Sequence, residues 1–216
     1  RFHQCGHTMI KPFRTNYILQ GLVLWLIVFW VITAIKPLYP RDWLLENLLV
    51  FFYAALLIIT YRWFRFSNLS YALFTLFLSL HLLGAHYTYS ETPFGFWLQD
   101  WFGFARNHYD RIVHFCFGLL IAYPFREILL RQTGVKREWS YFLAVTLVLA
   151  FSAFYEVIEG LAAMIVSPEL GAAYLGTQGD EWDAQKDSAM AFAGAIIAMC
   201  VTWQYDRQNN RRRISF

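Results

Sequence analysis

The sequence predicts an all-α, polytopic membrane protein in which six transmembrane helices form one bundle. Of its 216 residues, 58% are hydrophobic and only 15% are charged, whereas about 25% of the residues in soluble domains are charged. The chain also holds six apolar stretches of roughly twenty residues, the length that an α-helix needs to cross the hydrocarbon layer. The stretches lack the alternation of barrel strands, and a chain in lipid must satisfy its backbone hydrogen bonds within each segment.

The six predicted spans follow one another with short connections. They cover residues 17–35, 43–61, 69–87, 109–128, 141–165 and 185–204. The first is too long for the apolar part of a signal peptide and has no small-residue cleavage site, so we expect it to remain as a span. Pro124 lies late in the fourth span and is expected to end or kink that helix. Residues 93–101, PFGFWLQDW, are expected to lie along the outer membrane interface as an anchor.

The first eight residues, RFHQCGHT, are polar and precede Met9. We therefore set residues 1–8 apart, either as an added segment or as the end of a longer natural start. Residues 9–216 are expected to form a single six-helix transmembrane domain, because short connections keep consecutive spans together.

Basic residues are distributed unequally between the two sides of the membrane. The loops and tails on the side of the chain termini carry thirteen Lys and Arg residues, against three on the opposite side. Basic loops remain in the cytoplasm, so both termini are expected to be cytoplasmic. The basic residues are dispersed between apolar stretches and form no basic stripe, which argues against nucleic acid as a partner.

Four of the predicted helices carry ionisable residues at the outer level of the membrane. These are His81 and His86 in the third span, Asp110, Arg111 and His114 in the fourth, Glu156 and Glu159 in the fifth, and Asp183, Lys186 and Asp187 in the sixth. A charge inside a span costs about 2.5–3.5 kcal/mol, so such groups face the bundle interior or a wet cavity. Helical spacing places Asp110 and His114 on one face, and Ser152, Glu156 and Glu159 on another. We therefore expect one shared polar cavity.

The residue types in this cavity suit a divalent cation. One His with several carboxylates is typical of Zn²⁺ or Mn²⁺ sites, and an oxygen-rich set also suits Mg²⁺ or Ca²⁺. We assign the metal-ligand role to His114, Glu156, Asp183 and Asp110, proton transfer to Glu159 and Asp187, and substrate binding to Arg111, Lys186 and His86. His81 and His86 are five residues apart and point in different directions, so at most one is expected at the site. The alternative is a set of buried ion pairs that only fixes helix register.

Three glycines inside the spans are more typical of close helix contacts than of catalytic turns. They are Gly118, Gly160 and Gly194. We predict that each lets a neighbouring helix approach its backbone.

The strings on the outer side resemble a known family. They read GAHYTYSETPFGFWLQDWFGFARNHYDRIVHFCFGLL, SAFYEVIEGLAA and GTQGDEWDAQKDSAMAFAGA. These strings resemble the YjdF-type family of bacterial inner membrane proteins, over nearly the whole length from the first span to the last. The resemblance implies a multi-pass protein of the bacterial inner membrane and adds little chemistry.

A fainter resemblance is to VanZ-like proteins, which are linked to glycopeptide-antibiotic resistance. Their pattern is Asp-Lys-x-x-His-Phe, then Ser-x-x-x-Glu, then Asp-x-x-x-Asn-x-x-Gly. The residues that stand in these positions are Asp110, Arg111, His114, Phe115, Ser152, Glu156, Asp183, Asp187 and Gly194. Arg111 replaces the usual Lys, Asp187 replaces Asn, and Gly194 comes later than in the pattern. This resemblance implies a lipid or a lipid-linked envelope precursor as a partner.

Three functions follow from these observations. The leading hypothesis is an inner membrane protein whose polar cavity faces the outer leaflet and binds or acts on a lipid or envelope-precursor headgroup. Its enzymatic form is a metal-assisted hydrolase in which water attacks, because the sequence has no GxSxG nucleophile motif. The second hypothesis is an ion- or proton-coupled small-molecule transporter, although the cytoplasmic halves of the helices offer few polar residues for an exit path. The third is a non-catalytic envelope scaffold. The oligomeric state stays open.

Overall fold

A computed structural model describes residues 11–214 of the chain, and every described element is helical. Six long helices are α1 (Tyr17–Ala34), α2 (Pro40–Thr60), α3 (Asn68–His86), α5 (Tyr109–Gln132), α6 (Arg137–Ile165) and α8 (Asp183–Ile214). Three shorter ones are η1 (Phe13–Thr15), α4 (Pro93–Phe102) and α7 (Pro168–Leu175). Each of the six long helices contains a segment long and apolar enough to cross a membrane. The predicted all-α fold with six spans is confirmed, whereas the prediction about residues 1–8 lies outside the described residues.

The helix ends follow from local sequence. Asn16 and Ser67 each accept a hydrogen bond from a backbone N–H in the first turn of α1 and α3, respectively, which satisfies a donor that the helix itself leaves free. Proline stands in the first turn of α2, α4 and α7, where its missing N–H costs nothing. Gly103 and Gly176 adopt the left-handed conformation that ends α4 and α7.

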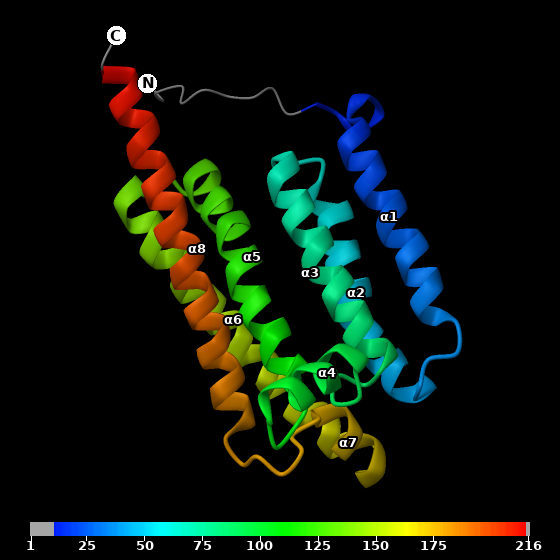
Figure 1. Cartoon of the computed structure of the whole chain (residues 1–216). Helices are drawn as coiled ribbons and strands as arrows, with labels where there is room; N and C mark the ends of the chain where they lie inside the picture. Colours follow the sequence, from blue (N-terminus) through cyan, green and yellow to red (C-terminus); the bar gives the residue numbers. More distant parts are fainter. Residues whose placement is uncertain (1–10, 215–216) are drawn as a thin grey trace.

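The long helices form two groups of three (Figure 1). Helices α1, α2 and α3 make one group and α5, α6 and α8 make the other, and α3 packs against α5 where the groups meet. The short helices α4 and α7 lie together at one end of the bundle, here named the α4/α7 end. Helix α1 begins and α8 ends at the opposite end, here named the terminal end (Figure 1). The charge bias predicts that the α4/α7 end faces outward.

Helices α5 and α8 approach each other through glycine and alanine. A Cβ atom added to Gly118 would lie 1.8 Å from the Ala191 carbonyl oxygen, and one added to Gly194 would lie 2.2 Å from the Phe115 carbonyl oxygen. The predicted close contacts at these two glycines are confirmed. The same prediction for Gly160 is wrong, because an added Cβ there would meet nothing within 4 Å.

The sequence predicts that Pro124 ends or kinks the fourth span. Helix α5 does not end there. It continues to Gln132, and Pro124 itself is almost fully buried. Neighbouring helices and local adjustment of the backbone allow proline inside a membrane-spanning helix. Helices α3 and α5 are also the most enclosed spans, with 56% and 50% of their apolar windows buried, against 11% in both α1 and α2.

Candidate functional site

Two loops at the α4/α7 end hold the first turns of α5 and α8 against each other. The Asn107 backbone N–H donates to Gln178 Oε1 at 3.1 Å, and Gln178 Nε2 donates back to the Asn107 carbonyl at 2.9 Å. Asn107 Nδ2 also donates to the Thr92 carbonyl at 3.1 Å, next to α4. Gly95 of α4 leaves room for this amide, since a Cβ there would lie 1.7 Å from Asn107 Oδ1. These contacts fix where the acidic residues of α5 and α8 meet.

Two arginines hold the carboxylate of Asp183 at the start of α8. Arg106 donates to both carboxylate oxygens, at 2.8 Å and 3.3 Å, and also to the Thr177 carbonyl at 2.7 Å. Arg111 Nη2 reaches Asp183 Oδ1 at 3.2 Å and pairs with Asp180 as well. A carboxylate that is 5% exposed needs such pairing, because an uncompensated buried charge is strongly destabilising.

Three carboxylates from α5 and α8 converge beside these arginines. One oxygen each from Asp110, Asp183 and Asp187 lies within 4.8 Å of the other two. Asp187 is 1% exposed, and its Oδ1 is buried without a hydrogen-bond partner among residues 11–214. The nearest basic atom in the ion pairs is Arg111 Nε at 3.9 Å, too far for a hydrogen bond. We name Asp110, Asp183 and Asp187 the carboxylate triad.

His114 connects the triad to α6. Its Nε2 lies 3.6 Å from Asp110 Oδ1 and 3.2 Å from Glu156 Oε1, and its Nδ1 lies 3.2 Å from the Ser152 hydroxyl. Neither carboxylate contact is a hydrogen bond, since Glu156 Oε1 is buried without a partner among the described residues and 3.6 Å is too long for one. Glu159 is one turn further along α6 and forms no ion pair with a basic side chain in the described part of the chain.

A second group of polar side chains joins α2, α3 and α6. Burial raises the pKa of Tyr89 well above its ordinary value, so its hydroxyl keeps its proton and donates to His81 Nδ1 at 2.5 Å. His81 Nε2 then donates to the Glu46 carbonyl at 3.0 Å, and the Tyr155 hydroxyl lies 3.4 Å from Glu46 Oε2. Glu46 is 2% exposed. The sequence reasoning missed it, although its place near the outer start of a span is the same signal that singled out the other acids.

Two residues predicted to bind substrate lie away from the triad. His86 Nδ1 is 2.8 Å from the Thr33 carbonyl and joins the ends of α3 and α1. Lys186 is half-exposed, and its Nζ contacts both oxygens of Asp180, at 2.8 Å and 2.6 Å. Lys186, followed by the Trp182 backbone N–H, holds the pKa of the Asp180 carboxyl well below its usual range. Their roles toward a substrate remain predictions.

Arg106 is a residue that the sequence reasoning did not place at the site. In the sequence it is the lone basic residue of an outer loop. Its position opposite a run of acids was the available signal, because an isolated arginine facing several carboxylates is drawn into an ion pair. His108, two residues further on, is not another cation, since burial, then Arg111 and Arg106, lower its pKa.

Acidic groups outnumber fixed cations in this region. The carboxyl groups are Asp110, Glu156, Glu159, Asp180, Asp183 and Asp187, and the cations are Arg106, Arg111 and Lys186. Fully ionised, the site would carry an excess of three negative charges. Such an excess in a buried site is relieved by protons or by a bound cation.

These observations define a class: a helical membrane protein with six spanning segments and a buried acidic site at one end. A family model described as "Predicted membrane protein (DUF2238)" matches residues 18–208. The chain is 37% identical over 204 residues to the "Inner membrane protein YjdF" of Escherichia coli (strain K12), covering 94% of this chain and 95% of that protein. The chain therefore belongs to the DUF2238 family of membrane proteins, and it is a multi-pass protein of the bacterial inner membrane. No solved structure matches it significantly.

Proposed function

We propose that the carboxylate triad binds one divalent cation and that the resulting centre holds the phosphate of a lipid or envelope-precursor headgroup at the outer leaflet. The observation that carries this proposal is the buried Asp187 Oδ1, which has no hydrogen-bond partner among the described residues and stands with two further carboxylates within 4.8 Å. An unpaired carboxylate oxygen in a buried site costs several kcal/mol unless a cation or a proton compensates it.

The spacing of the triad suits an ion with oxygen ligands. Two ligand atoms on opposite sides of an ion, each about 2.4 Å from it, lie about 4.8 Å apart. An all-carboxylate set favours Mg²⁺, Mn²⁺ or Ca²⁺, and His114 beside Asp110 would extend the choice to Zn²⁺. In this arrangement Asp110 and Asp183 keep the ligand role assigned from the sequence, and Asp187 is the third ligand. His114 lies beside Asp110, and Glu156 lies beside His114.

The remaining residues supply charge for a phosphate and a path for a proton. Arg111 lies at the edge of the triad with 19% of its side chain exposed, and guanidinium groups bind phosphate oxygens in pairs. Lys186 stands further out and would meet the headgroup first. In an enzymatic form, water attacks the phosphorus and its proton passes to Glu159 or Glu156, and that carboxyl group then returns the proton to the leaving oxygen as the P–O bond breaks and the alcohol departs.

Cation binding tests the proposal directly. We expect the full chain in detergent to bind about one Mn²⁺, measured by electron paramagnetic resonance, and Asp187→Asn to weaken that binding at least tenfold because a ligand charge is lost. The matched control is Glu127→Gln, which removes a carboxylate of α5 at the terminal end. Equal Mn²⁺ binding by Asp187→Asn and the unchanged protein would contradict the proposed cation site.

The same variants separate the site from a purely structural role. If the acids only fix helix register, Asp187→Asn should lower the thermal unfolding midpoint and leave headgroup binding per folded molecule unchanged. The proposal expects the reverse: a midpoint that stays the same or rises, because like charges are removed, and a loss of Mn²⁺-dependent binding to vesicles that contain phosphatidic acid. Phosphate release from those vesicles would establish the enzymatic form.

A further inference from the structure

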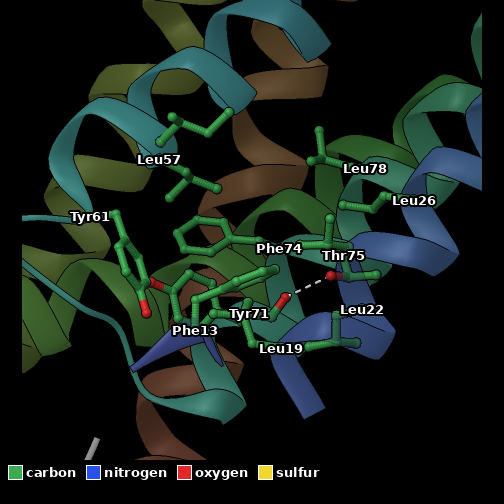
Figure 2. Close-up of a pocket in the computed structure, with 12 residues that line it drawn as sticks. Phe13, Leu19, Leu22, Leu26, Leu57, Tyr61, Tyr71, Phe74, Thr75 and Leu78 are labelled. Atoms are coloured by element: carbon green, nitrogen blue, oxygen red, sulfur yellow. Dashed lines mark hydrogen bonds between the residues drawn. The ribbon is translucent and has the colours of Figure 1, made fainter. Parts of the chain in front are cut away.

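An apolar groove opens between α1, α2 and α3 near the terminal end (Figure 2). Its volume is about 320 Å³, at the lower end of the range of roughly 300–1,000 Å³ for ligand pockets. Helix α1 contributes Leu19, Leu22 and Leu26, and the rings of Phe74 and Tyr71 form the α3 side (Figure 2). The groove lies within the spans, so its surroundings are lipid chains and not water.

Helices α1 and α2 both pack on α3, and the groove lies where side chains of all three helices meet at this end. The buried residues of α2 are Asp42, Glu46 and Asn47, all polar and all within its first two turns at the α4/α7 end. The apolar half of α2, which includes Leu57 and Ile58, lines the groove on one side. A second apolar cavity, of about 260 Å³, lies between α2, α3 and α5 and shares Leu57 and Phe74 with the first. No described side chain closes the groove toward the lipid at Ile58, which is 75% exposed.

Basic residues adjoin, along the chain, two residues that line the end of the groove. Lys11 and Arg14 flank Phe13, which lines the groove, and Arg62 and Arg65 follow Tyr61, which lines it as well. Residues 11–16 and 60–66 contain no acid, and these four basic side chains form no ion pair with any side chain that the structure describes in residues 11–209.

A polar atom also stands in the apolar wall without a partner. The Tyr61 hydroxyl is buried and forms no hydrogen bond with any described residue, and the Arg65 guanidinium lies 5.2 Å from the centre of the Tyr61 ring. A buried hydroxyl of this kind is normally satisfied by a ligand or by water. A ligand that places an acceptor beside Tyr61 and a negative charge beside the arginines would satisfy both.

We propose that this groove is a seat for an anionic phospholipid of the leaflet at the terminal end, with one acyl chain between α1 and α2 and the phosphate among Lys11, Arg14, Arg62 and Arg65. A second copy of the chain is disfavoured as the occupant, because two identical sets of basic residues would repel each other. The seat is separate from the acidic site, since it lies at the opposite end of the bundle and is lined by other residues.

Lipid retention measured by native mass spectrometry tests the seat, with the full chain in neutral detergent and either phosphatidylglycerol or phosphatidylcholine added. We expect phosphatidylglycerol to bind at least about 25-fold more tightly than phosphatidylcholine. The double variant Arg62→Gln with Arg65→Gln should weaken its binding about 25-fold, since each basic residue near an anionic lipid contributes roughly fivefold. Leu22→Trp should weaken both lipids by filling the groove, and Ile58→Trp, at an exposed position, does the same without disturbing helix packing.

Two controls keep other sources of binding apart. Arg41→Gln removes an exposed arginine at the α4/α7 end of α2 and should leave lipid retention unchanged, as should Asp187→Asn in the acidic site. Unchanged phosphatidylglycerol binding in Leu22→Trp and Ile58→Trp would show that the basic residues alone attract lipid. That result would contradict the proposed lipid site in the groove. Equal binding of the two lipids, or dimers that resist added phosphatidylglycerol and disappear in Ile58→Trp, would likewise overturn it.

Discussion

The two halves of the bundle are held together by different kinds of contact. Helices α5 and α8 touch backbone to backbone at Gly118 and Gly194, with Ala191 and Ala195 fully buried between them. Helices α1 and α2 pack on α3 through larger side chains, leave apolar cavities, and bury few of their own residues. Since lipid chains are as apolar as leucine, close packing of small residues is what drives association of the first kind.

The difference explains where the acidic site can be built. A cluster of buried charges must be held in one geometry, and the closely packed pair α5 and α8 supplies all three members of the carboxylate triad. Helix α2 instead buries only polar side chains, all near the α4/α7 end, and its other half exposes apolar side chains such as Ile58. We infer that one half of the molecule fixes the site and the other adapts to the membrane.

The largest effect is expected at the contact between α5 and α8. Gly118→Ala places a Cβ atom where the Ala191 carbonyl oxygen now lies 1.8 Å away, so the helices must separate. We expect a loss of about 3 kcal/mol or more in the free energy of unfolding, as in severe overpacking. Thermal unfolding in detergent, followed by circular dichroism, measures it.

The matched control for this variant lies in the other half. Gly21→Ala in α1 introduces the same methyl group where nothing lies within 4 Å, so its unfolding midpoint should stay within the error of the measurement or rise slightly. Similar losses for both variants would break the comparison, because they would show that the two halves are packed alike.

The spans and the depth of the acids could be predicted from the sequence because each rests on a local property. A length of about twenty apolar residues defines a span, and the position of Asp110 or Asp183 in its helix fixes its level in the membrane. The same spacing argument correctly grouped His114 with Asp110, which lie 3.6 Å apart. The close helix contacts at Gly118 and Gly194 were predicted as well, although the sequence did not show which helices would meet there.

The rest depends on how helices are rotated and on which loops meet, and the sequence does not contain that information locally. Arg106 reaches Asp183 only because the loop before α5 is tied to the loop before α8 by Asn107 and Gln178. Gly160 was expected to touch a neighbour, yet a Cβ added there would meet nothing within 4 Å. The grouping of the triad, with Asp187 as its most buried member, likewise required the packing angle of two helices.

An intermediate effect is expected at Asn47, the buried residue whose hydrogen bonds join α2 to α1 and which we name the polar anchor of α2. Asn47 is fully buried, accepts from Trp30 Nε1 at 2.7 Å and donates to the Trp43 carbonyl at 2.6 Å. Asn47→Ala leaves the Trp30 N–H without this partner, and we expect a loss of about 1–3 kcal/mol in stability. Hydrogen exchange should increase along α2 and α1 and stay constant in α5 and α8.

Thr60→Ala is the control for the anchor, because it removes an exposed hydroxyl that bonds only to Leu56 within the same helix, at the opposite end of α2. It should leave exchange in α2 unchanged. An increase in exchange that spreads equally into α5 and α8 after Asn47→Ala would mean that the two halves unfold as one unit, which would remove the mechanical distinction between them.

The smallest effect concerns the rim of the closely packed half, where Lys186 holds the pKa of Asp180 well below the ordinary value of 3.8. A carboxyl group whose pKa is lowered in the folded state stabilises the protein fully at a pH above its unfolded pKa. This contribution is lost as the pH falls through the lowered pKa of the folded state. Lys186→Met should therefore lower the unfolding midpoint slightly at pH 6, with the difference from the unchanged protein shrinking only as the pH falls below 3.8 toward the lowered pKa of Asp180. Lys136→Met, which changes a lysine at the start of α6 that forms no ion pair among the described residues, should show no such pH dependence. A Lys186→Met difference that stays constant as the pH falls from 6 to about 2 would place the contribution of Lys186 in packing of its apolar stem and not in its charge.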